Sequence, residues 1–397
     1  MTLSARKVSA FLFWTGLLFS TLYLSYRYPL QINFSGTSPT YSDTPLSLKL
    51  GKFFVMSVIC LAALPFFLRK KFTWQQIFVI FTVLFVSIIP AIKALGAFDG
   101  VYFDISFWPL AALLLVGALD QIRSQQIDKY LQFLFGYSIL STLVQVALFI
   151  FYGRLPALAY DNSISVRFGG FLDDPNGFAA VLFLLIGWAY YRYSGFKRLL
   201  AESLLLVCLL LTQSFTAVGF LFLLLVILFA RLLYKRPARI LWILPCLAVI
   251  LPLLASLYVS TLSDTISLLF QLKLPSINQH AFPWGVWMDE WTKWIVMGDS
   301  PFNFYESWWA SSLINFGILW YMADLFLVGS LVYSVIRAFR TITGQINRAV
   351  LSGTLIFCAY FVFGSVNLPL FTVFPINFLF FVLTFLVAFK RIDWEIA

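Results

Sequence analysis

Apolar runs about as long as a bilayer is thick recur from one end of this sequence to the other. The 397 residues are 61% hydrophobic and 11% charged, with a mean hydropathy of +0.91. A domain folded in water carries about a quarter charged residues, and a helix needs roughly 20 apolar residues to cross a bilayer. The sequence therefore predicts an all-α, polytopic membrane protein with one transmembrane domain over residues 1–397.

Twelve runs are predicted to be membrane spans. The first run lacks a small-residue cleavage site after it, so we expect a retained helix and not a removed signal. All four cysteines lie inside apolar runs, there is one histidine, and no nucleotide-binding fingerprint is present, so we expect no disulfide, metal or cofactor. The predicted spans lie near 8–26, 49–68, 74–92, 103–119, 130–152, 176–193, 199–213, 216–234, 240–260, 310–336, 349–367 and 370–389.

The basic residues indicate how the spans are oriented. With the N-terminus inside, 19 of the 27 Lys and Arg residues fall in cytoplasmic connections, whereas 11 of the 17 acidic residues fall outside. Because Lys and Arg accumulate in cytoplasmic loops, both termini are predicted to be cytoplasmic. The formal net charge of +10 is then expected to meet anionic membrane lipid and not nucleic acid.

One predicted outer connection, residues 153–175, ends in a compact polar motif. Residues 167–176 read RFGG-x3-DPN, with an arginine, two glycines and two aspartates just before a span. Charge and irregular backbone at membrane depth persist only where protein or a wet cavity surrounds them, so this motif is a candidate site. Asp-Pro and Asn-Gly are also common turn formers, and an ordinary surface loop explains the motif equally well.

The other long outer connection, residues 261–309 between the ninth and tenth spans, is rich in tryptophan. An amphipathic helix lying in the membrane interface explains a stripe of tryptophans, and a platform for stacking sugar rings is the functional alternative. Trp291 and Trp308 are the candidate sugar-binding residues in that alternative. The stripe consists of Trp284, Trp287, Trp291 and Trp294, at spacings of 3, 4 and 3 that share one helix face.

Arg167 is the candidate contact for a phosphate or diphosphate. A guanidinium pairs with phosphate oxygens in a bidentate manner, and main-chain N–H groups at Gly170 and its neighbour would add donors. A salt bridge to Asp173 or Asp174 is the structural alternative.

Three further polar residues are candidates for chemistry. Glu306 precedes Ser307 and two tryptophans at the start of a span, where partial desolvation suits a general base. The alternative for Glu306 is a helix-start carboxylate favoured by the helix dipole. His280 is the single histidine, and Asp324 lies inside the tenth span, where pairing with a lysine or hydroxyl is the structural explanation.

The motif before a span, the long loop and the residues that follow it resemble the O-antigen ligase and Wzy-type polymerase superfamily, GT-C-class membrane glycosyltransferases. The resemblance rests on Arg167-x-x-Gly170-x-x-x-Asp174-Pro175-Asn176 and on Glu306-Ser307 followed by Leu313-x-x-x-Gly317-Ile318. It covers roughly residues 160–330; the flanking spans match in hydropathy.

The resemblance implies a glycan carried on undecaprenyl diphosphate, handled at the periplasmic face of the bacterial inner membrane. Arg167 would contact the diphosphate, with Asp174 and Asn176 shaping its turn. A chain-length regulator protein is a partner that such enzymes use. Two departures matter: Gln213-Ser214-Phe215 stands where the superfamily often has Ser-Arg, and the long loop lacks its usual arginine, leaving Lys273, Lys293 and His280 as substitutes.

We therefore expect a metal-independent polysaccharide polymerase that moves a growing glycan from its lipid diphosphate onto a lipid-linked repeat unit. Ligases place a catalytic histidine where this chain has Glu306-Ser307, which favours a polymerase with Glu306, or else His280, as the base. The alternatives are a ligase acting on the lipid A core and a flippase for lipid-linked oligosaccharides. A flippase should concentrate polar features near the midplane and often has an internal repeat.

Overall fold

The computed structural model describes residues 3–23, 32–33, 40–41, 46–97, 100–152, 167–172, 174–235, 278, 282, 284–285 and 307–394. These residues are mostly helical, as the composition predicts. The helices are α1 (Leu3–Leu22), α3 (Leu46–Leu68), α4 (Trp74–Ala97), α5 (Gly100–Ala118), α6 (Ser124–Tyr152), α7 (Pro175–Arg192), α8 (Gly195–Leu211), α9 (Phe215–Lys235), α11 (Trp308–Thr341), α12 (Gln345–Gly364) and α13 (Ile376–Ala388).

Short elements complete the described chain. β1 (Ile32–Asn33) pairs with β2 (Thr40–Tyr41) in antiparallel fashion, and β3 (Ile122–Arg123) pairs with β4 (Ile392–Asp393) in parallel fashion. Two short 3-10 helices are η2 (Gly170–Leu172) and η5 (Leu370–Thr372).

Six of the described helices are long and apolar enough to cross a membrane, which confirms a membrane-embedded helical protein. These six are α3, α4, α5, α6, α11 and α12. The predicted span at 240–260 lies outside the described residues, and the total of twelve spans stays a prediction, as does their orientation.

Two helix boundaries differ from the sequence prediction for identifiable reasons. α6 begins at Ser124, six residues before the predicted span, because the buried Asp128 carboxylate is satisfied by Trp188 and Arg192 and does not end the helix. The last predicted span is shortened to α13, because Pro375 lacks an N–H group and stands at the start of the helix.

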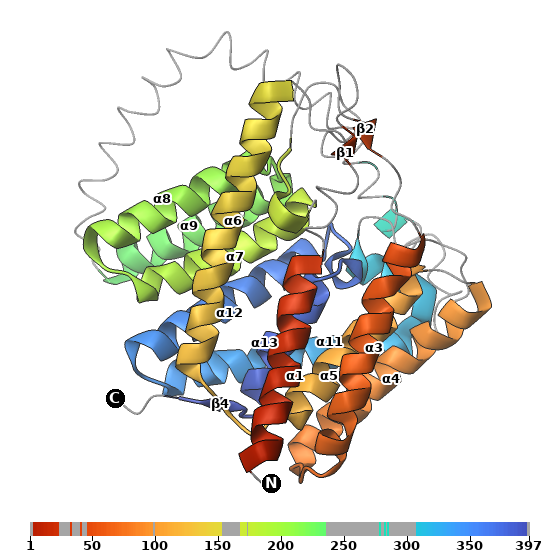
Figure 1. The fold of residues 1–397 in the computed structure, drawn as a ribbon. Helices are drawn as coiled ribbons and strands as arrows, with labels where there is room; N and C mark the ends of the chain where they lie inside the picture. Colours follow the sequence, from red (N-terminus) through yellow and green to blue (C-terminus); the bar gives the residue numbers. More distant parts are fainter. Residues whose placement is uncertain are drawn as a thin grey trace, which may run out of the picture.

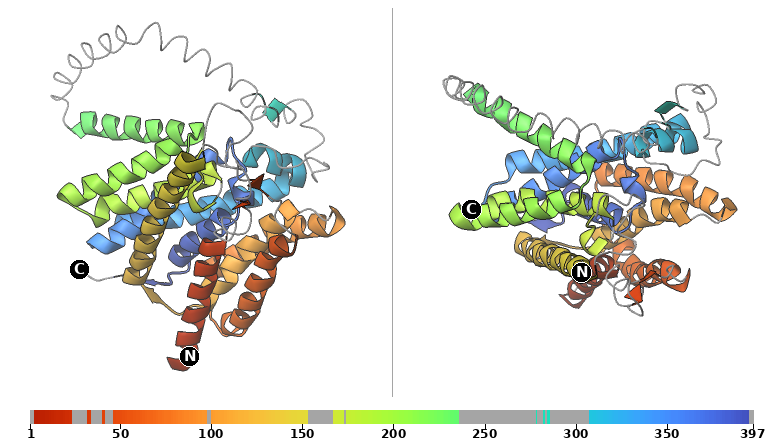
Figure 2. Two further views of the ribbon diagram at one scale, coloured as in Figure 1. Left: turned by 45° about the horizontal axis from the view of Figure 1, so that its top comes forward. Right: turned by 90° about the horizontal axis from the view of Figure 1, so that it is seen from above.

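The pair α7 and α12 forms the centre of the fold. Figures 1 and 2 show the green helices α7, α8 and α9 on one side of the blue α12 and α13, and the orange helices α3 and α4 on the other. α7 packs along α12 with glycines at the contact: a Cβ on Gly353 would lie 2.6 Å from the Leu184 carbonyl oxygen. Small residues of this kind let helices in membranes approach closely.

Three of the basic residues predicted to face the cytoplasm, Arg6, Lys70 and Arg192, pair with acidic residues near ends of the helices. Arg6 and Lys70 both pair with Asp120, which follows α5. Arg192 at the end of α7 pairs with Asp128 near the start of α6, with Nε and Oδ2 3.0 Å apart. β4 is held to β3 at the same end, where α1 begins (Figure 1).

The other end of the helices carries the polar motif, and we call it the motif end. α7, α9 and α11 begin there, and α8 and α12 end there, as the contacts described below establish. α11 is interrupted close to this end, because Gly317 has φ of +80°.

The tight crossing of α7 and α12 predicts a specific loss of stability. In Gly353→Ala the new methyl group must displace main-chain atoms of α7, so we expect a loss of about 1–3 kcal/mol of stability. Gly136→Ala in α6 is the matched control, because nothing lies within 4 Å of its Cβ position. Thermal unfolding in detergent, followed by tryptophan fluorescence, measures both. Equal unfolding midpoints for the two variants would contradict the close packing of α7 against α12.

Candidate active site at the motif end

Arg167 lies between the end of α8 and the start of α7. Its Nε donates to the carbonyl oxygen of Thr212 at 3.2 Å, and its Nη2 donates to Oδ1 of Asn176 at 3.0 Å. Both acceptors are uncharged and fix the orientation of the guanidinium, and the Asp174 carboxylate interacts electrostatically with its charge. A bidentate donor whose plane is fixed in this way suits a phosphate or diphosphate.

Asn176 joins the motif to a third helix. Its Oδ1 also accepts from the Ser214 hydroxyl at 2.8 Å, and Ser214 in turn accepts from the main-chain N–H of Ala217 in the first turn of α9. Ser214 therefore contributes a hydroxyl that holds the Asn176 side chain.

Asp174 caps the N-terminus of α7. Its carboxylate accepts from the main-chain N–H groups of Asn176 at 3.1 Å and Gly177 at 2.9 Å, and Pro175 occupies the first helical position. Burial raises the pKa of the Asp174 carboxyl, while the two N–H groups and Arg167 act in the opposite direction. The contribution that the structure supports for Asp174 is thus the start of α7 and the turn before it.

Gly170 meets a conformational requirement. It has φ of +55°, and a Cβ there would lie 2.4 Å from the Phe178 ring. The Gln145 side chain of α6 donates to the Gly170 carbonyl at 2.7 Å and accepts from its N–H at 2.9 Å. This N–H group, which we expected to serve a phosphate, thus donates to Gln145.

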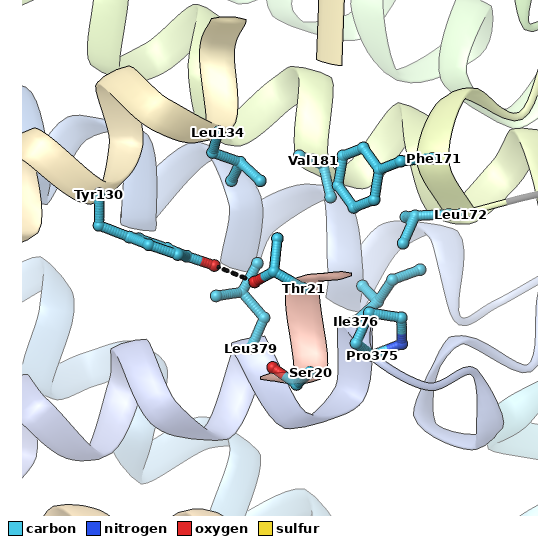
Figure 3. A pocket seen from close by; sticks show the side chains of 10 residues that line it. All are labelled: Ser20, Thr21, Tyr130, Leu134, Phe171, Leu172, Val181, Pro375, Ile376 and Leu379. Carbon is cyan, nitrogen blue, oxygen red and sulfur yellow. Dashed lines mark hydrogen bonds between the residues drawn. The ribbon is translucent and has the colours of Figure 1, made fainter. Parts of the chain in front are cut away.

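The apolar half of the motif faces the interior. Phe171 and Leu172 of η2 line a small pocket with residues of α1, α6, α7 and α13, and the hydroxyls of Thr21 and Tyr130 lie 2.8 Å apart at its side (Figure 3). The side chains after Gly170 therefore anchor the motif in the helix bundle.

Tyr360 connects the motif to α12. It is fully buried, and its hydroxyl donates to the Asn176 carbonyl oxygen at 3.3 Å. Sequence reasoning did not single out Gln145 or Tyr360, and it noted Ser214 only as part of a departure from the superfamily's pattern. The signal available for Gln145 was its place as an amide well inside an apolar run.

Trp308 is a core residue of the bundle. It is 1% exposed and stacks on Phe371 with ring centroids 4.8 Å apart. Its Nε1 donates to the Asp324 carboxylate at 3.0 Å, so an indole, and not a lysine or hydroxyl, is the partner seen for this intramembrane acid. Trp308 in this position stabilises the start of α11 and has no ring face turned to a sugar.

The long loop returns to the bundle beside the end of α12. Ser307 caps α11 by accepting from the Ala310 N–H at 3.4 Å, and the Trp308 N–H donates to the Ser365 carbonyl at 3.0 Å. Trp284 of the stripe donates through Nε1 to the Val366 carbonyl at 3.4 Å. The other candidates, Glu306, His280, Lys273, Lys293 and Trp291, lie outside the described residues.

No metal site emerges within the described ranges, where no three His, Cys, Asp or Glu side chains are grouped to hold an ion. The chain matches no protein-family model, and a search of curated proteins finds no match.

The raised pKa of Asp174 predicts a pH dependence of stability. The folded protein binds this proton more tightly than the unfolded chain, so the stabilisation is full below the unfolded pKa of about 3.9. It is lost as the pH rises through the higher folded pKa. Asp174→Asn keeps the cap and does not titrate.

We therefore expect the stability of the wild type relative to Asp174→Asn to decrease as the pH is raised from about 4 toward neutrality. Denaturant unfolding in detergent at several pH values measures this difference. A difference that is constant or grows with pH would show that burial does not dominate the Asp174 carboxyl.

Proposed function

We propose that this protein is a polysaccharide polymerase of the bacterial inner membrane. It would transfer a glycan from undecaprenyl diphosphate onto a lipid-linked repeat unit at the periplasmic face. The residues at the motif end support a polymerase better than they support a ligase or a flippase.

The observation that carries the proposal is that the last turns of α12 hold two separate parts of the chain. Arg167, Thr212, Asn176 and Ser214 are joined by hydrogen bonds, and we call them the Arg167 cluster. The Tyr360 hydroxyl donates to the Asn176 carbonyl within this cluster, and the Ser365 carbonyl accepts from the first N–H groups of α11. Five residues of helix correspond to about 7.5 Å along its axis. Arg167, through Asn176, and the start of α11, two residues after Glu306, are therefore linked to the same short stretch of α12.

The reaction requires a cation and a base. The acceptor hydroxyl oxygen attacks the anomeric carbon, the bond from that carbon to the diphosphate oxygen breaks, and the hydroxyl proton passes to the base. Arg167 would stabilise the departing diphosphate, assisted by Lys273 or Lys293. Glu306, or else His280, would accept the proton, and the cations make a metal unnecessary.

A flippase for lipid-linked oligosaccharides is the second candidate. Transporters often carry broken membrane helices at their binding site, and α11 is interrupted at Gly317. Transfer of the glycan to a lipid A core, the ligase reaction, is the variant within the enzyme class.

Purified protein in lipid vesicles with lipid-linked repeat units tests these functions together. A polymerase produces a ladder of longer lipid-linked glycans. A flippase moves the repeat unit across the bilayer without lengthening it, and a ligase extends only when lipid A core is supplied. Absence of any lengthened product would refute the proposed polymerase.

Arg167 can be tested by changing its charge or the charge of its partner. Arg167→Lys removes the bidentate fork, and Asn176→Asp places a carboxylate on the guanidinium in a side chain of nearly the same shape. We expect both variants to fold and to lose about 10²-fold or more of the polymerase rate. Ladder length in a complementation strain is the readout.

Protein level and unfolding temperature serve as controls for these variants. Ser214→Ala is the matched control, because it removes a neutral donor to the same Asn176 oxygen. Ladders of wild-type length from both Arg167→Lys and Asn176→Asp would show that Arg167 does not bind the diphosphate.

The base can be identified by two substitutions. Glu306→Gln keeps the shape and removes the basicity, so we expect substrate to bind while the rate falls by ~10²–10⁴-fold. His280→Ala should then have a small effect. If Glu306→Gln polymerises within a fewfold of wild type while His280→Ala does not, the base is His280 and the ligase-like reaction moves ahead.

A further inference from the structure

The break in α11 is hydrogen-bonded to two neighbouring helices, α4 and α5. Gly317 interrupts the helix after residues 308–316, which we call the first segment of α11. The Asn315 carbonyl at the end of this segment accepts from the Lys93 ammonium of α4, and the Asn315 Oδ1 accepts from the Tyr102 hydroxyl of α5 at 3.0 Å. The break is therefore a defined structure with its own side-chain partners.

Lys93 has the position that electrostatics favours for a cation. The C-terminus of a helical segment carries partial negative charge and carbonyl groups without intrahelical partners. The Lys93 ammonium meets such a carbonyl and also lies 5.5 Å from the centre of the Phe316 ring. Lysine at this position therefore stabilises the end of the first segment.

The first segment is fixed at its beginning as well. Trp308 bonds α12 through its main chain and Asp324 through its indole. Ser311 and Ser312 between the two anchors are buried. The segment is thus held between the end of α12, which also carries the Arg167 cluster, and Lys93.

We propose that Lys93 is a positioning residue for the transfer reaction. By holding the end of the first segment of α11, it fixes the position of Ser307, at the start of that segment, relative to Arg167. This inference rests on the proposed function, in which the residue before Ser307 in the sequence is the general base. Lys93 itself touches no substrate in this scheme.

Kinetics with lipid-linked repeat units test the positioning role. Lys93→Met keeps the length of the side chain and removes the charge and the donor. We expect kcat to fall about 10²-fold, the size of effect that a displacement of about 1 Å can have. KM should change by less than threefold, because the Arg167 cluster is built on α7, α8, α9 and α12.

Two variants complete the kinetic comparison. Lys93→Arg keeps a cationic donor and should recover most of the lost kcat. Lys70→Met is the matched control, since it removes a helix-end lysine that pairs with Asp120 at the opposite end, and it should leave kcat unchanged. An unchanged kcat in Lys93→Met would overturn the positioning role.

Cysteine labelling tests the same inference without activity. In a variant lacking the native cysteines, Ser312→Cys should be protected from a hydrophilic thiol reagent, because Ser312 is 0% exposed. Adding Lys93→Met should raise the labelling rate by tenfold or more, whereas adding Lys70→Met should not. Equal protection in all three backgrounds would refute the inference.

The kinetic and labelling tests distinguish failure of the inference about Lys93 from failure of the proposed function. Wild-type protein without transferase activity would refute the polymerase. The labelling comparison would still decide whether Lys93 holds the first segment of α11.

Discussion

The close crossing of α7 and α12 is the contact on which the arrangement around Arg167 depends. Without a Cβ at Gly187 and Gly353, the two backbones approach to a distance at which each glycine faces main-chain atoms of the other helix. Association of helices in lipid relies on such packing, because burial of apolar surface supplies little driving force there. The crossing fixes the start of α7 beside the end of α12, and the motif is built across that junction.

Hydrogen bonds between side chains and main-chain groups explain how a short irregular segment persists at the motif. Within or near a bilayer an unsatisfied N–H or C=O group costs several kcal/mol. The Gln145 amide pairs with both main-chain groups of Gly170, and Asp174 takes up two N–H groups at the start of α7. Side chains thus replace the missing helical partners, and the turn before α7 becomes a rigid platform for Arg167.

The sequence predicts the local part of this site and misses the part made by distant residues. Asp-Pro-Asn before an apolar run predicts a helix start, and the structure has Asp174 as its cap. Gln145 and Tyr360 come from other helices and Ser214 from the turn between α8 and α9, and which helix faces which cannot be read from hydropathy.

The structural roles of Trp308 and Gly317 could not be predicted from the sequence for a related reason. An indole at the start of a span suits both the membrane interface and the core, and burial against Phe371 decides for Trp308. Gly317 within an apolar run is compatible with an unbroken helix, and the structure has a positive φ there beside the tertiary contacts of Asn315.

The two cations at helix ends, Lys93 and Arg167, differ in a way that bears on their proposed roles. Lys93 lies at the C-terminal end of a helical segment, where a positive charge is stabilising, so its place is explained by the fold alone. Arg167 donates to the Thr212 carbonyl at the end of α8, where a positive charge is favoured, but it also lies beside residues that begin α7 and α9, where the helix dipoles oppose one.

The Asp174 carboxylate offsets part of that opposition, and an anion bound at the same two helix starts would offset more. A diphosphate held by Arg167 would meet a charged fork beside the starts of two helices. This difference between the two cations is the physical argument for the proposals that Arg167 contacts substrate and that Lys93 sets position.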